Sequence, residues 1–399
     1  MSSPVVRRLA LLSTVHFLHN LAHCSYLHLP GFLDRLGART STIGPIMATL
    51  TLSAVLFRPL IGRVLDTQDR RLVAVAASAC NVVVCLLYLT VSKVGPWIYC
   101  VRFAHGIVWA AVLSALFTMA ADLIPAERRI QGIGLFGVAG MLPLSVAGLV
   151  GDALLARGSY GVLFCFAAAA AASATLVVAM LPESRGERRA ADPDRPWLRV
   201  VMAASLRPVW LIGMAMAVSV SSYLTFIKSF VLARGIGSVG AFFTAYTIAA
   251  VTARTVFGRL PDRLGTNRAL PISVLSLAAG LLLLAASQST AWVMVAGVFC
   301  GIGQGYAFPT AMALVVDRAH PSERGSAMAA FTALFDLGVF TGSIALGALL
   351  SRTSYSTMYA CAAAIALLGA ATFARSVAGT WQSEGVGPMP PAGAPERRW

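Results

Sequence analysis

The sequence is poor in charged residues. Only 12% of its 399 residues are Asp, Glu, Lys or Arg, whereas a soluble globular protein carries about 25% charged residues. Hydrophobic residues make up 58% and gather in about a dozen stretches of roughly 20 residues, each of which would cross a bilayer core as a helix. The shortage of charge excludes a soluble domain and predicts an all-α membrane protein.

The sequence also lacks the motifs of several chemistries. No GxxxxGK[ST] loop occurs, which excludes ATP bound within this chain as the energy source. The seven cysteines form no CxxC pair and lie in apolar stretches, which predicts small hydrophobic side chains and no disulfide or zinc framework. We therefore expect no cofactor and no resident metal.

Lysine is nearly missing, and arginine supplies 29 of the 31 basic residues. The net charge of +15 could indicate nucleic acid as a partner, but the placement of the arginines argues against it. With a cytoplasmic N-terminus and twelve spans, about 21 basic residues lie on the cytoplasmic side and about 6 on the outer side. This bias predicts that both termini are cytoplasmic and that the basic turns set topology and contact anionic lipid.

The apolar stretches predict twelve spans, at 9–33, 41–65, 72–92, 96–121, 130–156, 160–181, 207–232, 238–262, 269–288, 291–317, 326–350 and 355–376. A polar segment at 182–206 carries prolines and arginines that cannot lie in hydrocarbon. We expect it to be a cytoplasmic linker between a six-helix bundle at 1–181 and another at 207–376. The tail at 377–399 is rich in Gly and Pro and is expected to be disordered.

Two turns recur at a fixed separation. The stretch FRPLIGRVLDTQDRR, beginning at Phe57, returns as ARTVFGRLPDRLGTNR, beginning at Ala253. Four identical pairs are each 196 residues apart, namely Arg58 and Arg254, Gly62 and Gly258, Arg63 and Arg259, and Asp66 and Asp262. The turn DLIPAERRIQG after span four is matched by DRAHPSERGSA after span ten. These repeats predict two pseudo-symmetric six-span halves in the same orientation, a known transporter architecture.

On these motifs the chain resembles the major facilitator superfamily over all twelve spans. A separate run, LP…LG…RP, resembles a bacterial subgroup of small-molecule or sugar efflux permeases; its residues are Leu29, Pro30, Leu36, Gly37, Arg58 and Pro59. In the superfamily, the aspartate corresponding to Asp66 contacts the start of span eleven, here near Arg324 to Met328, and holds the cytoplasmic side shut. Gly62 would allow close helix approach. The alternative is that these residues only set topology. The residues assigned to gating are Arg58, Gly62, Arg63, Asp66, Arg70, Arg71, Arg254, Gly258, Arg259, Asp262 and Arg263.

Charged residues inside spans are candidates for proton coupling, because burying a charge in a bilayer is costly. Arg102, four residues before Gly106 in span four, resembles a family arginine linked to proton coupling; the alternative is a structural ion pair. Asp336 falls near the middle of span eleven, where a carboxyl could load and release a proton or could bond to backbone or an arginine. Asp34 and Asp152, near outer span ends where water reaches them, are further candidates.

Span one carries a polar stripe. His16, His19, Asn20 and His23 recur at helical spacing, and His105 of span four lies at a depth similar to that of His23. The family resemblance implies that spans one, four, seven and ten line a central cavity, so the stripe is expected to face the cargo. Histidine could exchange protons, bond to cargo, bind a metal or only pack the helices.

The second half offers fewer polar groups for the same cavity. We expect Tyr223, Thr225 and Lys228 of span seven and Gln304 and Tyr306 of span ten to line it, although Lys228 could instead extend outward. Span five, GIGLFGVAGMLPLSVAGLVG, resembles the antiporter signature of the family's exporters, with Leu142 in place of a usual glycine. This likeness favours export.

The sequence therefore predicts a monomeric, proton-coupled exporter of a small polar molecule in the bacterial inner membrane. The cavity, with several histidines and few acids, suits a polar, anionic or metal-chelating cargo. The alternatives are a proton symporter for uptake, a non-transporting membrane sensor and a metal-dependent membrane enzyme. The expected partners are cargo, protons and the bilayer.

Overall fold

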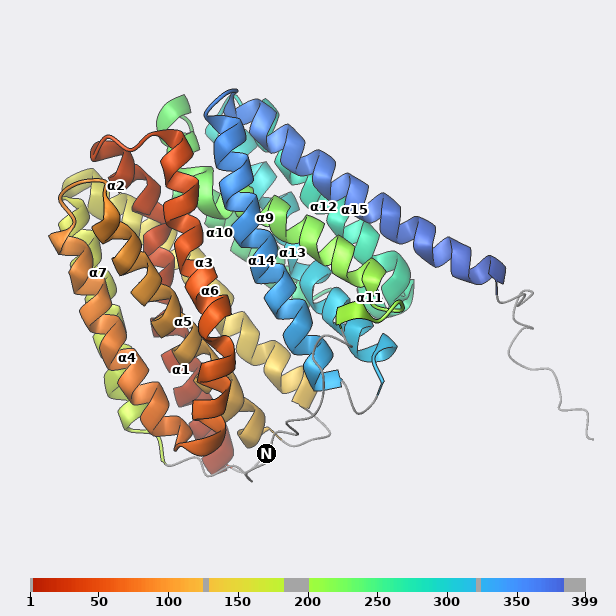
Figure 1. Ribbon diagram of the computed structural model, residues 1–399, viewed down its shortest axis with the longest axis horizontal. Coiled ribbons are helices and arrows are strands. Elements are labelled where there is room, and N and C mark those ends of the chain that lie inside the picture. Colours follow the sequence, from red (N-terminus) through yellow and green to blue (C-terminus); the bar gives the residue numbers. More distant parts are fainter. Residues whose placement is uncertain (1–2, 125–128, 183–200, 321–323, 384–399) are drawn as a thin grey trace, which may run out of the picture.

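The computed structural model describes residues 3–124, 129–182, 201–320 and 324–383, and these ranges contain helices and turns but no strand. Long helices run side by side through the molecule (Figure 1). Ten helices within the described ranges are long and apolar enough to cross a membrane, which confirms the prediction of an all-α membrane protein.

The helices fall into two groups by their order along the chain, one before and one after residues 183–200. The first comprises α1 (Ser3–Cys24), the short 3-10 helix η1 (Ser25–His28), α2 (Leu29–Arg35), α3 (Thr40–Thr67), α4 (Arg70–Leu87), the 3-10 helix η2 (Tyr88–Thr90), α5 (Pro96–Leu123), α6 (Arg129–Arg157) and α7 (Tyr160–Ala179). The second comprises α9 (Arg207–Arg234), α10 (Val239–Thr255), α11 (Leu260–Leu264), α12 (Thr266–Ala286), α13 (Thr290–Arg318), α14 (Arg324–Leu350) and α15 (Tyr355–Ser383).

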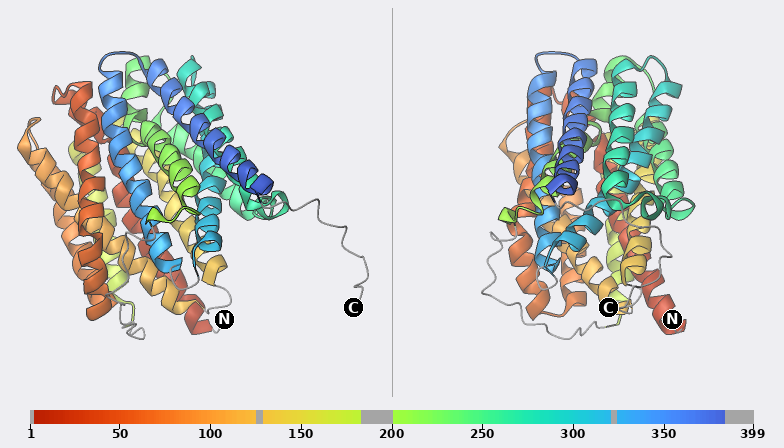
Figure 2. Two further views of the ribbon diagram at one scale, coloured as in Figure 1. Left: turned by 45° about the vertical axis from the view of Figure 1, so that its right-hand side comes forward. Right: turned by 90° about the vertical axis from the view of Figure 1, so that its right-hand side faces the viewer.

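Two long helix pairs join these groups, α3 with α14 and α6 with α10, while η1 and α2 also contact α9. In the left-hand view of Figure 2, the red and orange helices of the first group lie on one side and the cyan helices of the second group on the other. The end of the molecule that carries α2 is called the α2 end, and the opposite end, where α1 begins, is called the N-terminal end.

Glycines allow both helix pairs to approach closely at the α2 end. A Cβ atom added to Gly44 of α3 would collide with the Ser343 carbonyl oxygen of α14, and one added to Gly240 of α10 would lie 2.9 Å from Leu149 of α6. Gly44 and Gly240 are 196 residues apart, the separation of the repeated turns. The repeat therefore extends from the turns to the packing surfaces.

Two of the twelve long helices in the described ranges do not meet the length and hydropathy criteria for a membrane span. α1 carries the polar stripe, which lowers its hydropathy, and its expected span at 9–33 is interrupted by η1 before α2 begins. α10 has only 17 residues, because it ends at Thr255; before it, Gly235 and Gly237 adopt positive φ angles of 64° and 72° in the turn that follows α9. A left-handed backbone is open to glycine at low cost.

The two copies of the repeated turn fold differently. α3 stays helical through Gly62 to Thr67, whereas the span expected at 238–262 ends at Thr255 and is followed by the short helix α11. Pro261 stands at the start of α11 and cannot donate the backbone hydrogen bond that a continuous helix would need. At the other end of the chain, α15 continues to Ser383, past the expected boundary at 376.

Candidate functional site

A cavity of about 300 Å³ lies between the two helix groups. Its polar lining consists of Asn20, His23, Tyr26, Thr51, Arg102, Tyr223, Thr225, Tyr246, Gln304 and Ser343. Six of these were predicted from the sequence, namely Asn20, His23, Arg102, Tyr223, Thr225 and Gln304. They come from α1, α5, α9 and α13, which are the first, fourth, seventh and tenth long helices of the described ranges. The cavity therefore receives polar groups from both halves of the chain.

Arg102 is a buried cation in this cavity, with 3% of its surface exposed. Its guanidinium donates to the Met47 carbonyl oxygen (3.2 Å) and to the Tyr88 hydroxyl (3.4 Å), and its Nε has no hydrogen-bond partner in the part of the chain that the structure describes. No ion pair among the described residues includes Arg102. The predicted alternative of a structural ion pair thus has no observed partner there.

His23 forms an aromatic group beside Arg102. Its ring stacks on Trp109 at 5.0 Å between centroids and meets His105 edge to face at 5.6 Å. His105 lies behind the cavity wall, with Nδ1 3.0 Å from the Tyr88 hydroxyl. Tyr88 therefore connects Arg102 and His105, and His23 is the histidine that lines the cavity.

The remaining histidines of the stripe face neighbouring helices. The ring of His16 stacks on Phe136 of α6 at 4.4 Å, and its Nδ1 lies 3.1 Å from the Phe136 carbonyl oxygen. The Nδ1 atom of His19 lies 3.4 Å from Asn81 of α4. α1 packs against α5, α6 and α7, so only part of its stripe reaches the cavity. These two histidines have packing contacts and do not line the cavity.

Two predicted lining residues also lie elsewhere. Tyr306 donates its hydroxyl to the Phe257 carbonyl oxygen (3.0 Å). Lys228 extends to the α2 end, where its Nζ lies 3.5 Å from Asp152 Oδ1. There it borders a second pocket, of about 490 Å³, that also contains Asp34. Partial burial raises the pKa of the Asp34 carboxyl above its ordinary value.

Asp336 forms an ion pair between the helix groups. Its Oδ2 lies 2.6 Å from Nη2 of Arg58, and the side chains are 15% and 27% exposed. Phe335 and Val339, on either side of Asp336 in the chain, line the cavity. Of the alternatives for Asp336, the arginine contact is therefore observed.

The repeat does not reproduce this ion pair. Arg254, the counterpart of Arg58, donates from Nε to the Gly305 carbonyl oxygen of its own group at 2.8 Å. The position 196 residues before Asp336 is Gly140. The second interface therefore lacks an acid at this depth.

The turn residues give a mixed picture. The side chains of Asp66 and Asp262 lie outside the described part of the structure, as does that of Arg324, so the expected contact at the start of α14 is not described. A Cβ atom added to Gly62 would meet nothing within 4 Å, so the described residues show no close approach at this glycine. A Cβ atom added to Gly258 would meet only backbone atoms of Arg254, four residues earlier in the sequence.

The basic residues of the turns mostly hold local structure. Arg70 pairs with Asp122 of α5, and Arg71 donates to the Ala179 carbonyl oxygen of α7. Asp69, not among the predicted site residues, caps α4 by accepting from the Arg71 amide at 2.7 Å. Exposed side chains at the ends of the turns are Arg63, Arg259 and Arg263.

A polar cluster at the α2 end was not predicted. Asp152 lies 3.1 Å from His28 and accepts a hydrogen bond from the Gly240 amide across the α6–α10 interface. The acid near the end of span five was visible in the sequence as a candidate, but no sequence pattern paired it with His28. Within the described ranges, no three His, Cys, Asp or Glu side chains are placed to hold a metal ion.

A model of the Major Facilitator Superfamily matches this chain over residues 9–242 and again over residues 209–393. The chain belongs to the major facilitator superfamily. An uncharacterised MFS-type transporter of Salmonella typhimurium is 28% identical over 340 residues, which cover 82% of this chain and 85% of the relative. Another, of Burkholderia pseudomallei, is 27% identical over 369 residues, which cover 86% and 85%.

Solved structures share the superfamily fold. A variant of the nucleoside transporter NupG has a TM-score of 0.78 at 15% identity, covering 92% of this chain and 98% of that one. A human organic anion transporter has a TM-score of 0.72 at 19% identity, covering 93% and 100%. As a superfamily member, this chain is a multi-pass secondary transporter of the membrane.

Proposed function

We propose that this superfamily member is a proton-coupled exporter of a small organic anion and works by alternating access in the bacterial inner membrane. The proposal treats residues 1–181 and 207–376 as two six-span bundles joined by a cytoplasmic linker, of which residues 183–200 lie outside the described ranges. The arginine bias places both termini in the cytoplasm, so the α2 end faces outward.

The observation that carries the proposal is Arg102. It is a buried guanidinium in a cavity shared by both groups, and no acid among the described residues neutralises it. A buried charge is costly unless it is paired, and an anionic cargo would supply the missing partner. Arginine can hold a carboxylate or phosphate through two hydrogen bonds. His23, Tyr223 and Gln304 add groups that can donate hydrogen bonds to the same cargo.

The packing of the two groups indicates which side the cavity meets. Glycine contacts and the Ser145–Thr244 hydrogen bond (2.8 Å) close the groups together at the α2 end. Farther toward the N-terminal end of the same helix pair, a Cβ atom added to Gly137 would meet nothing within 4 Å. This contrast supports a conformation closed to the outside, the state in which an exporter loads cargo from the cytoplasm.

The Arg58–Asp336 pair offers a route for proton coupling. It crosses the groups directly beside the cavity, so its strength biases one conformation over the other. A proton on Asp336 removes the charge that attracts Arg58 and weakens this contact. In the proposed cycle, Asp336 takes a proton from the outer side and releases it to the cytoplasm, while cargo moves outward.

A proton symporter for uptake remains the second candidate, because the same pair would serve it with the direction reversed. Two similar folds are named as a nucleoside transporter and an organic anion transporter, so the superfamily fold handles polar cargo of both kinds. The likeness of span five to the antiporter signature favours export.

The test is flux in proteoliposomes. Vesicles containing the purified chain would receive a mixture of small organic acids, sugars, nucleosides and amines inside and out, and a pH gradient would then be imposed. We expect mass spectrometry to show that organic anions move against the proton flow. Arg102→Gln should reduce this flux at least about tenfold through loss of a charge-assisted contact. Arg157→Gln, at an exposed position, is the control.

Three results would contradict the proposal. Movement of cargo with the protons would establish the symporter. Movement of cations or uncharged compounds alone would overturn the assignment of Arg102. The absence of any flux from a folded, correctly inserted chain would support a sensor.

A further inference from the structure

We infer that Asp152 is a second proton-binding site of the transporter, on the outer side, and that its carboxylate latches the two helix groups together. The inference rests on the proposed alternating access but not on the identity of the cargo or the direction of transport. It concerns a cluster that the central cavity does not include, since the 490 Å³ pocket at the α2 end is lined by Asp152 and Lys228.

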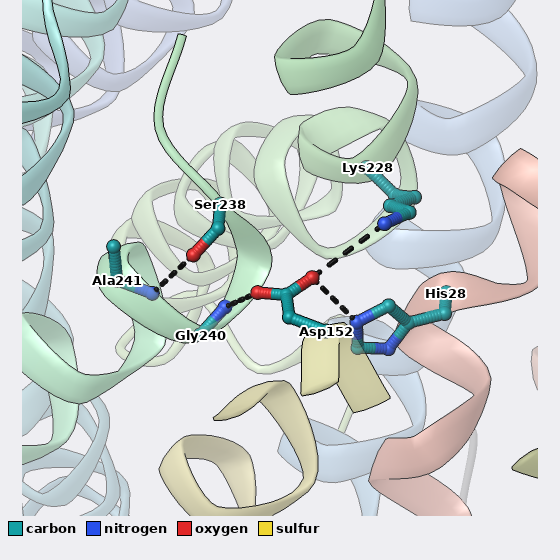
Figure 3. Close-up of polar contacts among 6 residues, drawn as sticks. All are labelled: His28, Asp152, Lys228, Ser238, Gly240 and Ala241. Atoms are coloured by element: carbon teal, nitrogen blue, oxygen red, sulfur yellow. Dashed lines mark hydrogen bonds and ion pairs between the residues drawn. The ribbon is translucent and has the colours of Figure 1, made fainter. Parts of the chain in front are cut away.

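Asp152 is surrounded by hydrogen-bond donors from both groups (Figure 3). Oδ1 lies 3.1 Å from Nε2 of His28, in its own group, and 3.5 Å from Nζ of Lys228 in the other. Oδ2 accepts a hydrogen bond of 2.7 Å from the Gly240 amide, also in the other group. An ionised carboxylate accepts all three contacts, whereas a protonated one carries an O–H group and no charge.

The position of Gly240 adds a helix end to this cluster. Ser238 caps α10 by accepting from the Ala241 amide at 3.0 Å, so Gly240 contributes one of the free amides in the first turn. The N-terminus of a helix favours a negative charge nearby. Asp152 therefore completes the capping of α10 from across the interface, and separation of the groups would leave both partners without this contact.

Glycines fix the geometry of the cluster. A Cβ atom added to Gly148 would lie 2.9 Å from the Gly240 Cα, and one added to Gly151 would collide with the ring of His28. These positions let α6 approach α10 and η1 closely enough for Asp152 to reach its three donors. The cluster is thus part of the interface and not a chance contact between surface side chains.

Water reaches Asp152 more readily than it reaches the donors. Its side chain is 22% exposed, whereas His28 is fully buried and Lys228 is 9% exposed. The other ionisable groups lining the adjacent pocket are Asp34 and Arg35 of α2 and Tyr160 of α7, and Arg35 lies over the Tyr160 ring at 4.8 Å. A proton that arrives through this pocket meets Asp152 at the boundary between water and the interface.

The sign of the pH effect follows from these contacts. The ionised carboxylate attracts Lys228 and the end of α10, so the latch holds while Asp152 is charged. Protonation removes that attraction, so the latch loosens as the outer pH falls. Under the proposed alternating access, a low outer pH therefore favours separation of the two helix groups at the outer end, whichever way the cargo moves.

Hydrogen–deuterium exchange of the full-length chain in lipid nanodiscs tests this without any cargo. The readout is the exchange rate of the amides at 239–243, compared with the middle of α12 as an internal reference for folding. We expect Asp152→Asn to speed exchange of the first turn of α10 about tenfold or more, because a charge-assisted cross-group contact is lost. Asp34→Asn, which changes a carboxylate lining the same pocket, is the matched control and should leave the rate unchanged.

Lowering the pH should also speed exchange of this turn in the natural protein, after correction for intrinsic amide exchange, and should have no further effect in Asp152→Asn. His28→Gln should retain the pH response, which would show that the response comes from the Asp152 carboxyl and not from the His28 imidazole. The inference is overturned if protection of α10 in the natural protein does not depend on pH. It is also overturned if Asp152→Asn leaves the rate unchanged, or if His28→Gln abolishes the response. If Asp152→Asn does not fold, the natural protein and His28→Gln still decide the question.

The two proposals fail separately. If the latch depends on pH but the chain transports nothing, the proposed function is contradicted and the proton site at Asp152 is supported. If flux is driven by protons but amide exchange in the first turn of α10 does not depend on pH, the proposed function is supported and the proton site at Asp152 is contradicted.

Discussion

The two interfaces between the helix groups share their packing but differ in where their charges lie. At the α3–α14 interface, Arg58 and Asp336 form an ion pair in the part of α3 nearer the N-terminal end, and the α2 end is closed by glycine against backbone. At the α6–α10 interface, the charged group is Asp152 at the α2 end. The internal repeat has thus preserved glycines that bring the helices together, such as Gly44 and Gly240, but neither Asp336 nor Asp152 has an acidic counterpart.

This difference suggests a division of work. Shared packing allows both interfaces to separate at either end, as alternating access requires. Protonation of Asp336, beside the cavity, would weaken the contact between the groups there. Protonation of Asp152 would weaken the contact at the outer end. Three matched comparisons test this account, in order of expected effect.

The largest difference is expected between substitutions of Arg58 and of its repeat counterpart Arg254. Arg58→Gln removes the cation that a proton on Asp336 displaces, so we expect gradient-driven flux to fall about 10- to 100-fold, the usual range of a coupling energy between sites. Arg254→Gln should reduce flux less than about threefold, because the side-chain hydrogen bond described for Arg254 goes to a carbonyl of its own group. Flux measured at equal amounts of inserted protein checks both. Equal losses would mean that the two arginines only set topology.

A smaller difference, in stability, is expected between substitutions of two glycines of α3. Gly44→Ala places a methyl group against the Ser343 carbonyl oxygen, and such overpacking costs about 1–3 kcal/mol. Gly62→Ala adds a methyl group in open space and gains helix propensity, so stability should stay the same or rise by up to about 1 kcal/mol. Thermal unfolding in detergent would show this contrast. A loss in Gly62→Ala as large as in Gly44→Ala would contradict the observed packing.

The smallest difference, in the KM for cargo, is expected between substitutions of two histidines of α1. His23→Ala removes a side chain that lines the cavity, and we expect the KM for cargo to rise about 5- to 10-fold, as for loss of one hydrogen bond. His16→Ala removes a ring stacked on Phe136 and should lower stability while leaving the KM nearly unchanged. Flux as a function of cargo concentration distinguishes the two. A raised KM in His16→Ala would place that residue in the cargo path.

The architecture could be predicted from the sequence because repeats and hydropathy are local patterns. The pairs at a separation of 196 residues indicated two similar halves, and Asn20, His23, Arg102, Tyr223 and Gln304 follow from helix faces that meet in one cavity. The break after Thr255 was missed, because the hydropathy of α10 continues into a segment that Pro261 interrupts.

Contacts between the halves could not be predicted in the same way. His28, Asp152 and Lys228 come together only when α6, α9 and η1 are assembled, and no repeat partner marks them, since residue 348, which corresponds to Asp152, is alanine. The partner of Asp336 was likewise open, because a carboxyl on a long helix can face several neighbours. The helix pairs α3–α14 and α6–α10 decide these contacts, and a single sequence does not encode them as a visible pattern.

The most direct test of the central claim measures proton movement caused by cargo. Vesicles containing the chain and a pH-sensitive dye, with no gradient imposed, would receive cargo on one side. The account predicts that the natural protein acidifies the cargo-loaded compartment as cargo leaves it, and that Asp336→Asn exchanges cargo for cargo but moves no protons. Proton movement that persists in Asp336→Asn at the natural stoichiometry would contradict the assignment of the inner proton site to the Arg58–Asp336 pair.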